Sequence, residues 1–292
     1  MPLLAAPNLS EGRDAKLIAH LEAAFARGAA VLDRHSDPDH NRTVFTISGS
    51  PGPLVDALVS GAEMAIEGID MSRHEGLHPS IGALDVCPVV WLDPADREPA
   101  RTEAREVAGQ IGGLGVPVFL YGELATRPEH AERAYFREGG VGELVARMRG
   151  GELRSDYGPD LPHPTAGATL VTARPPLAAF NVELDTSDVE VARVVAGALR
   201  EAGGGLPGVR AIGLRLGSGR AQVSTNIHDP LAVRLGDVVR RVRALAEPLG
   251  AKPVQAELVG LVPEGGLEEY PDDVPIRGFN PQLHVIERRL PV

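Results

Sequence analysis

The spacing of apolar and polar positions predicts alternating strands and helices in the second half of the chain. Residues 187–202 and 231–249 carry apolar side chains at helical spacing, and Gly250 ends the second of these helices. Strands are expected at residues 177–184, 209–216, 220–227 and 254–262. The resulting order, β-α-β-β-α-β, is typical of ferredoxin-like domains.

The first half of the chain repeats this order. Strands are expected at residues 3–7, 29–34, 43–49 and 83–91, and helices at residues 12–27 and 54–69. A helix over 94–113 and a strand over 116–124 would extend the same sheet. The sequence therefore predicts an α/β (α+β) fold of two duplicated ferredoxin-like βαββαβ sandwiches, at residues 1–175 and 176–292.

The segment between the two halves, residues 126–170, is rich in Arg, Glu, Gly and Pro. A linker is the simplest interpretation of such a composition. Proline and glycine also shape ligand-binding loops, and pockets often form at domain junctions. Both interpretations are open on composition alone.

Composition and charge narrow the classes of function. The net charge of −11 over 292 residues argues against binding to nucleic acid or to an anionic membrane. No apolar run is long enough to span a bilayer, and the first residues lack the features of a signal peptide, so a cytoplasmic protein is expected. Cys87 is the sole cysteine and lies in an apolar run, which favours a buried structural thiol in a reducing compartment.

Residues 74–78 read His-Glu-Gly-Leu-His, which matches the H-E-x-x-H pattern of zinc proteases. That pattern binds zinc only on a helix, where residues four apart share a face. Gly76 lies inside the segment, and Pro79 disfavours a helical backbone at His78. No metal site is expected here.

The longer pattern His-x-Gly-x-His-Pro-x-x-Gly-Ala-Leu-Asp-Val-Cys-Pro, residues 74–88, resembles the glutamate formiminotransferase family. It resembles the formiminotransferase domain of the formiminotransferase-cyclodeaminase family, without the cyclodeaminase module. Further matches follow in family order at residues 7–12, 41–44, 118–123, 158–159, 167–169, 179–181, 221–226 and 258–263.

This resemblance implies transfer of a formimino group from N-formimino-L-glutamate to N5 of tetrahydrofolate, a step of histidine degradation. Tetrahydrofolate would be the co-substrate, and His78 would be the catalytic general acid and base. The resemblance places the folate-binding loop at Gly158, Pro159, Asp160, Leu161, Pro162, His163, Pro164, Thr165, Ala166 and Gly167. It also implies a homodimer.

Several other polar residues are candidates for substrate binding. Arg42 and Arg73 could bind the carboxylates of the donor through bidentate contacts, and either could equally be a surface charge. Asn41 and His74 are further candidates, and the carboxylates around His35 could orient a histidine or bind the pterin: Asp33, Asp37 and Asp39. Ser80 departs from the family, whose members commonly have arginine at that place.

Three alternatives stay open. The donor could be formylglutamate, the protein could be a non-catalytic folate-binding paralogue, or His74 and His78 could serve a zinc hydrolase. The leading interpretation predicts that residues 70–80 and 158–167 share one site, in a cleft between the two halves.

Overall fold

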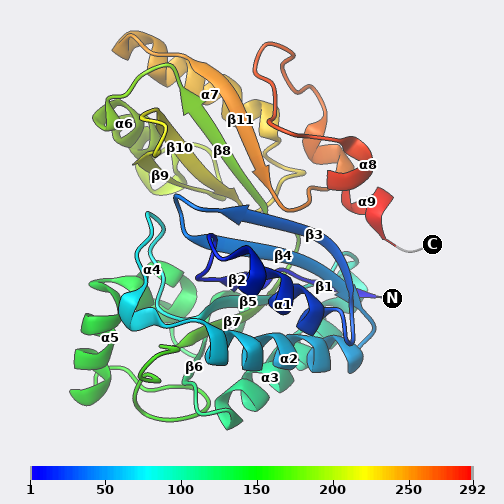
Figure 1. The fold of residues 1–292 in the computed structure, drawn as a ribbon. Coiled ribbons are helices and arrows are strands. Elements are labelled where there is room, and N and C mark those ends of the chain that lie inside the picture. The colour runs from blue at the N-terminus through cyan, green and yellow to red at the C-terminus, as the bar shows by residue number, and fades with distance from the viewer. Residues whose placement is uncertain (1, 291–292) are drawn as a thin grey trace. The chain divides into compact units, whose positions relative to one another are not determined.

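The computed structural model describes residues 2–290, and the chain divides into two compact units between Arg174 and Pro175. Each unit has its own β-sheet and its own hydrophobic core. The predicted mixed α/β class is confirmed (Figure 1). No helix among residues 2–290 is both long and apolar enough to cross a membrane.

The sheet of the first unit has seven strands in the order β3-β4-β1/β2-β5-β7-β6. β1 and β2 follow one another between β4 and β5, and both pair antiparallel with these neighbours. β5, β7 and β6 run parallel. The strands are β1 (Leu3–Ala5), β2 (Asn8–Leu9), β3 (Ala30–Asp37), β4 (Arg42–Gly49), β5 (Leu84–Val90), β6 (Val118–Leu120) and β7 (Thr169–Arg174).

Three amphipathic helices cover one face of this sheet: α1 (Ala15–Phe25), α2 (Pro53–Gly68) and α3 (Arg97–Gly113) (Figure 1). Their apolar sides pack on the inward residues of the strands and form the main core. Phe25 and Phe45 meet there with ring centroids 5.2 Å apart. Gly61 of α2 allows this packing, because a Cβ at that position would lie 2.0 Å from the Phe25 ring.

The segment over residues 126–170, for which a linker was one interpretation, instead packs on the sheet of the first unit. It contains α4 (Arg133–Arg137) and α5 (Gly140–Arg149), which bury Phe136 and Leu144 against the sheet face opposite α1–α3. It also leads into β7, which lies between β5 and β6. The sequence did not predict these two helices, because charged residues and glycines interrupt the apolar positions of this segment.

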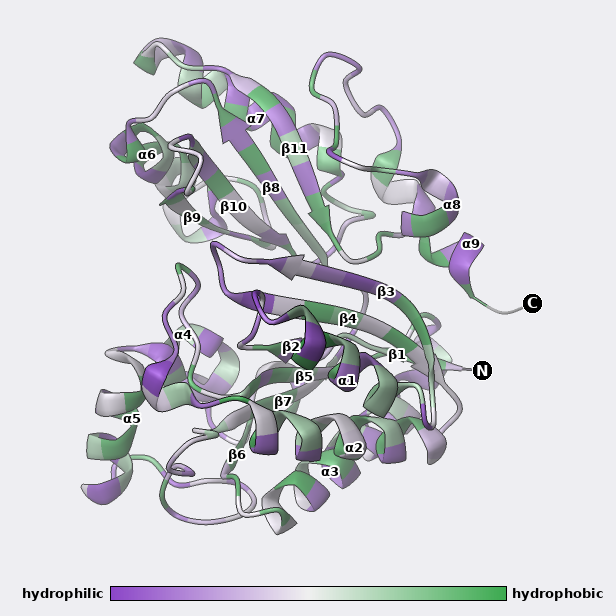
Figure 2. Ribbon diagram, in the orientation of Figure 1, coloured by the Kyte–Doolittle hydropathy of each residue, from purple (hydrophilic) through white to green (hydrophobic). Residues whose placement is uncertain are grey.

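The strand limits differ from prediction at two places in the first unit. β6 covers only three residues of the expected strand over 116–124, because a 3-10 turn at Gly122–Leu124 follows it. β3 continues to Asp37, beyond the expected end at residue 34. Figure 2 shows that this last part of β3 is hydrophilic. Pairing with β4 extends the strand through polar residues.

The second unit has the expected strand–helix–strand–strand–helix–strand order. Its four strands are all antiparallel, in the order β11-β8-β10-β9. The helices bury apolar residues against one face of the sheet. The elements are β8 (Ala178–Leu184), α6 (Val189–Leu199), β9 (Val209–Arg215), β10 (Ala221–Ile227), α7 (Leu235–Ala246) and β11 (Pro253–Val259), followed by the short helices α8 (Pro281–His284) and α9 (Ile286–Arg289).

Candidate active site

The tight turn between β3 and β4 holds a histidine against a carboxylate. The Asp37 carboxylate accepts backbone hydrogen bonds from Asp39 (2.8 Å) and His40 (2.9 Å), and His40 Nδ1 lies 2.6 Å from its other oxygen. Burial alone would raise the pKa of Asp37, but the hydrogen bonds from His40 and Asp39 and the nearby His40 ring lower it to about 2. Asp37 therefore stays ionised and fixes the orientation of the buried His40 ring.

Asn41 ties this turn to the loop that carries the two motif histidines. Its backbone is left-handed, with φ of 48°, and its side-chain oxygen accepts from the Gly12 N–H at 2.9 Å. Its amide nitrogen donates to the Glu75 carbonyl (3.0 Å) and lies 3.3 Å from His74 Nδ1. Gly76 permits the close approach, since a Cβ there would lie 2.3 Å from the His40 carbonyl oxygen.

His78 receives a hydrogen bond from the first residue of β4. Arg42 Nη1 lies 2.6 Å from His78 Nε2. A guanidinium group can only donate, so Nε2 is the acceptor and the imidazole proton resides on Nδ1. Burial, together with the nearby charges of Arg42, Arg137 and Arg133, lowers the pKa of His78 well below its usual range. The imidazole is therefore neutral at physiological pH.

Two arginines of α4 join Arg42 around one buried carboxylate. Asp85 of β5 is ion-paired with Arg137 and accepts a hydrogen bond from the Ile81 N–H at 2.8 Å. Arg133 lies over the Tyr121 ring, 6.0 Å from its centroid. Burial and the charges of Arg137 and Arg133 lower the pKa of Arg42 to about 10. The surroundings of His78 are thus positive in a chain whose net charge is −11.

The expected folate loop adjoins the histidine loop at its C-terminal end. The Met71 N–H donates to the Thr165 carbonyl (2.7 Å), and the Ala83 N–H donates to the Ala166 carbonyl (2.9 Å). Gly167, with φ of 68°, packs where a Cβ would lie 2.1 Å from the Ile81 carbonyl oxygen. The end of the 158–167 segment therefore lies beside residues 71–83.

Two models of known protein families match this chain. Residues 3–174 match the formiminotransferase domain, N-terminal subdomain, and residues 179–269 match the formiminotransferase domain. The first match alone covers more than half of the chain.

The chain belongs to the formiminotransferase family.

Its relatives in this family include single-module proteins of the same length and longer ones. A glutamate formimidoyltransferase from Streptococcus pyogenes serotype M1 is 35% identical over 97% of both chains. Another, from Thermoplasma acidophilum, is 34% identical over 97% of this chain and 95% of its own. A formimidoyltransferase-cyclodeaminase from Sus scrofa is 38% identical over 88% of this chain and 49% of its own.

In the structure of this formiminotransferase, only some of the predicted site residues lie close together. His78, Arg42, His74 and Asn41 are brought together by the β3–β4 turn and the loop after α2. Arg73 is exposed at the end of the 3-10 turn Met71–Arg73. The two ends of the expected folate loop pack against different elements. Gly167 packs against Ile81 in the histidine loop, whereas Gly158 packs against α3, where a Cβ would lie 3.0 Å from the Cα of Gly112.

The structure shows whether Cys87 is buried and whether the segment with the zinc-protease pattern is helical. Cys87 is fully buried in the main core, and burial raises the pKa of its thiol to about 12, which confirms its interpretation as a structural residue. Residues 74–78 are not helical, so they lack the geometry that the zinc-protease pattern requires. Among residues 2–290, no cluster of three or more His, Cys, Asp or Glu side chains could hold a metal ion.

Sequence reasoning missed four residues of this site: His40, Asp85, Arg133 and Arg137. Asp85 carries a signal that sequence could have offered, because a carboxylate inside an apolar strand needs a buried partner. Arg133 and Arg137, one helical turn apart, carried no such signal, since their segment resembled a linker.

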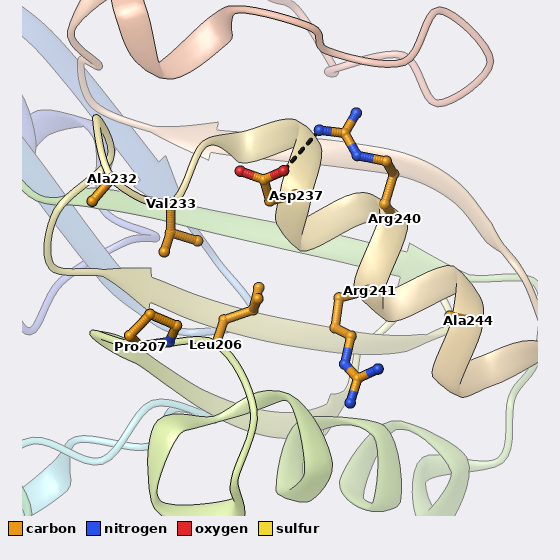
Figure 3. Close-up of a pocket in the computed structure, with 8 residues that line it drawn as sticks. All are labelled: Leu206, Pro207, Ala232, Val233, Asp237, Arg240, Arg241 and Ala244. Carbon is orange, nitrogen blue, oxygen red and sulfur yellow. Dashed lines mark hydrogen bonds and ion pairs between the residues drawn. The ribbon is translucent and has the colours of Figure 1, made fainter.

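A surface pocket on the second unit is a poor candidate for the chemistry. It has a volume of about 470 Å³ and lies along α7, where Asp237 and Arg240 pair with each other at 2.8 Å (Figure 3). Its lining offers no histidine or cysteine to move a proton: Leu206, Pro207, Ala232, Val233, Asp237, Arg240, Arg241 and Ala244.

Proposed function

We propose that this protein transfers the formimino group from N-formimino-L-glutamate to N5 of tetrahydrofolate, giving 5-formiminotetrahydrofolate and glutamate, as in histidine degradation. The near full-length similarity to two glutamate formimidoyltransferases supports this assignment. The observation that carries it in the structure is the neutral His78, held through Nε2 inside a cationic site. Its loop bonds through Met71 and Ala83 to the end of the 158–167 segment.

His78 is the proposed proton carrier. As N5 attacks the formimino carbon, the N5–C bond forms and the N5 proton passes to the imidazole. The bond from carbon to the glutamate nitrogen then breaks, and the imidazole returns the proton to that nitrogen. A neutral imidazole is the form that this cycle needs at its start, and the low pKa of His78 supplies it.

Tetrahydrofolate is the proposed co-substrate, with residues 158–167 as its binding loop and no metal involved. The first part of the loop, residues 158–161, is exposed, whereas Ala166 and Gly167 at its end are buried. His163 Nδ1 accepts from the Ala166 N–H at 3.0 Å and stiffens the loop from within. Rigid loops of this kind lose little entropy when a ligand binds.

The donor would be bound on the other side of His78. Arg42 is the proposed carboxylate ligand, and Arg73, Asn41 and His74 are the further candidates. The Asn41 amide already has three protein partners, which supports a role in positioning the loop as well.

We also infer that the two units are ferredoxin-like duplicates, with subdomains at residues 1–175 and 176–292. The strand orders support this. In the first unit, β1 lies between β4 and β5, and β3 lies beside β4. In the second unit, β8 lies between β10 and β11, and β9 lies beside β10. A homodimer in the cytoplasm is the proposed assembly.

The deciding experiment is a direct assay of the purified protein with N-formimino-L-glutamate and tetrahydrofolate, in which mass spectrometry follows the folate product. We expect 5-formiminotetrahydrofolate and glutamate in equal amounts. N-formyl-L-glutamate in a parallel reaction tests the formyl donor. Binding of tetrahydrofolate without transfer from either donor would establish a folate-binding protein instead.

A chelator and metal analysis complete this assay. We expect full activity after dialysis against a chelator and no stoichiometric metal in the protein. Stoichiometric zinc with activity lost on chelation would contradict the proposed chemistry.

A further inference from the structure

Positive charge is in excess around His78. Three guanidinium groups gather there, those of Arg42, Arg133 and Arg137, and each affects the pKa of His78. Asp85, the carboxylate that is ion-paired with Arg137, also accepts a hydrogen bond from the Ile81 N–H. Asp37 acts on Arg42 and the exposed Glu132 acts on Arg133, but the arginines are the charged groups with the largest effect on the pKa of His78. Unbalanced charge away from water is costly, so such a cluster is typical of a site that binds an anion.

Two buried N–H donors of this cluster also have no partner among residues 2–290. Arg137 donates to Asp85 through Nη2, but its Nε is buried and unpaired. His78 Nδ1, which carries the proton while Nε2 accepts from Arg42, is likewise buried and unpaired. Unmade hydrogen bonds of buried donors destabilise a structure unless a ligand supplies acceptors.

We infer that Arg42, Arg133 and Arg137 form a binding site for a dicarboxylate, and that a carboxylate bound to Arg42 releases the Nε2 lone pair of His78. The identity of the ligand rests on the proposed function, in which the donor carries the two carboxylates of glutamate.

The release of His78 follows from hydrogen-bond strength. A guanidinium group binds a carboxylate more strongly than a neutral imidazole, because both partners are charged. Arg42 therefore exchanges its bond to Nε2 for a bond to the ligand. The bound negative charge also offsets the cations that lower the pKa of His78, so the imidazole becomes a stronger base once the donor is in place.

Binding of glutarate, a dicarboxylate without a transferable group, tests this site apart from catalysis. Calorimetry would compare wild type with Arg133→Gln, Arg137→Gln and the matched control Arg127→Gln, an exposed arginine of the preceding turn. We expect glutarate affinity to fall about 10- to 100-fold in the first two variants, the effect of losing a charged hydrogen bond. Arg127→Gln should bind as wild type does.

The tautomer of His78 reports on the second half of the inference. In ¹⁵N-histidine-labelled protein, with His78→Gln used for assignment, Nε2 of His78 should show a hydrogen-bonded acceptor shift that changes on saturation with glutarate. An unchanged His78 signal at saturation would refute the release of the lone pair. Equal glutarate affinity in all variants, or none in wild type, would refute the site itself.

These outcomes are separable from those of the transfer assay. Glutarate binding that depends on Arg133, in a protein that transfers nothing from N-formimino-L-glutamate, would keep the site and remove the proposed donor. Arg133→Lys gives a further check, because it keeps the charge but loses the planar fork. We expect it to bind glutarate with an affinity between those of wild type and Arg133→Gln.

Discussion

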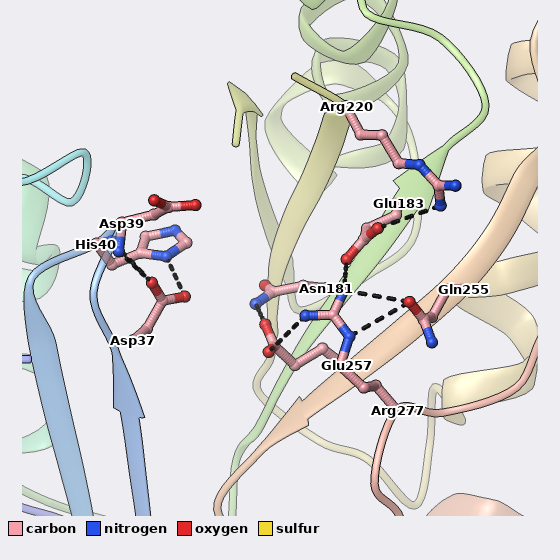
Figure 4. Close-up of polar contacts among 9 residues, drawn as sticks. All are labelled: Asp37, Asp39, His40, Asn181, Glu183, Arg220, Gln255, Glu257 and Arg277. Atoms are coloured by element: carbon pink, nitrogen blue, oxygen red, sulfur yellow. Dashed lines mark hydrogen bonds and ion pairs between the residues drawn. The ribbon is translucent and has the colours of Figure 1, made fainter. Parts of the chain in front are cut away.

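The polar clusters of the two units differ in how completely they are paired. In the second unit, the carboxylate of Glu183 is 4% exposed and pairs with Arg277 and with Arg220, the latter at 3.6 Å (Figure 4). Arg277 also lies 3.8 Å from Glu257, whose carboxylate accepts from Asn181 at 3.2 Å. Glu183 therefore has two cations beside it, and Glu257 has one cation and one hydrogen-bond donor.

Around His78 in the first unit, the pairing is incomplete. Arg42 hydrogen-bonds a neutral imidazole, and Arg137 and His78 keep one buried N–H each without a partner among residues 2–290. Buried ionisable groups therefore do not by themselves mark a reactive site. An excess of charge of one sign and donors left without acceptors are the features that do.

The strongest test of this contrast is His78→Ala. Turnover of formimino transfer should fall about 10²- to 10⁴-fold, the usual contribution of a general acid and base, while tetrahydrofolate affinity changes far less. His74→Ala should reduce turnover less, because His74 lies beside the Asn41 amide rather than in the arginine cluster. Steady-state kinetics with circular dichroism would measure both, and a well-folded His78→Ala protein with near-normal turnover would defeat the mechanism.

Removing the counter-ion of the first cluster should cost stability. Asp85→Asn leaves three neighbouring arginines without their compensating charge, and we expect the free energy of unfolding to fall by about 3 kcal/mol or more. Denaturant titration at neutral pH would measure the loss. Added glutarate should restore part of it, since the ligand replaces the missing charge; a variant as stable as wild type would contradict the charge excess.

The β3–β4 turn should respond to acid. The pKa of Asp37 is about 2 in the folded protein, below its usual value of 3.8, so its contribution to stability is present above pH 3.8 and is lost as the pH falls through 2. We expect Asp37→Asn to be less stable than wild type at pH 6 by about 2 kcal/mol or less. The two curves of unfolding free energy against pH should converge between pH 4 and 2, and a constant difference there would show that Asp37 does not titrate with folding.

The smallest effect is expected in the paired network of the second unit. Glu183→Gln keeps the shape and an acceptor oxygen, and its partner Arg277 is half exposed and can turn to water. The free energy of unfolding should fall by about 1 kcal/mol. A loss as large as that of Asp85→Asn, measured under the same conditions, would remove the distinction between the two clusters.

Local physical chemistry in the sequence determined much of this protein. The second unit's order of strands and helices followed from apolar spacing, because each amphipathic element must bury one face. The burial of Cys87 followed from its apolar neighbours. The motif around His78 made it the catalytic candidate, and the glycine and proline of that motif also explained why residues 74–78 are not helical.

Tertiary structure decided the rest. β7 lies between β5 and β6, a parallel arrangement that pairing over long sequence distances creates and local spacing does not encode. Arg137 meets Asp85 across 52 residues, and Arg42 meets His78 across 36. The local sequence around a charged residue does not show whether its side chain lies on the solvated surface or in a binding site. Only the fold brings these three partly buried arginines together around Asp85 and His78, as the proposed site requires.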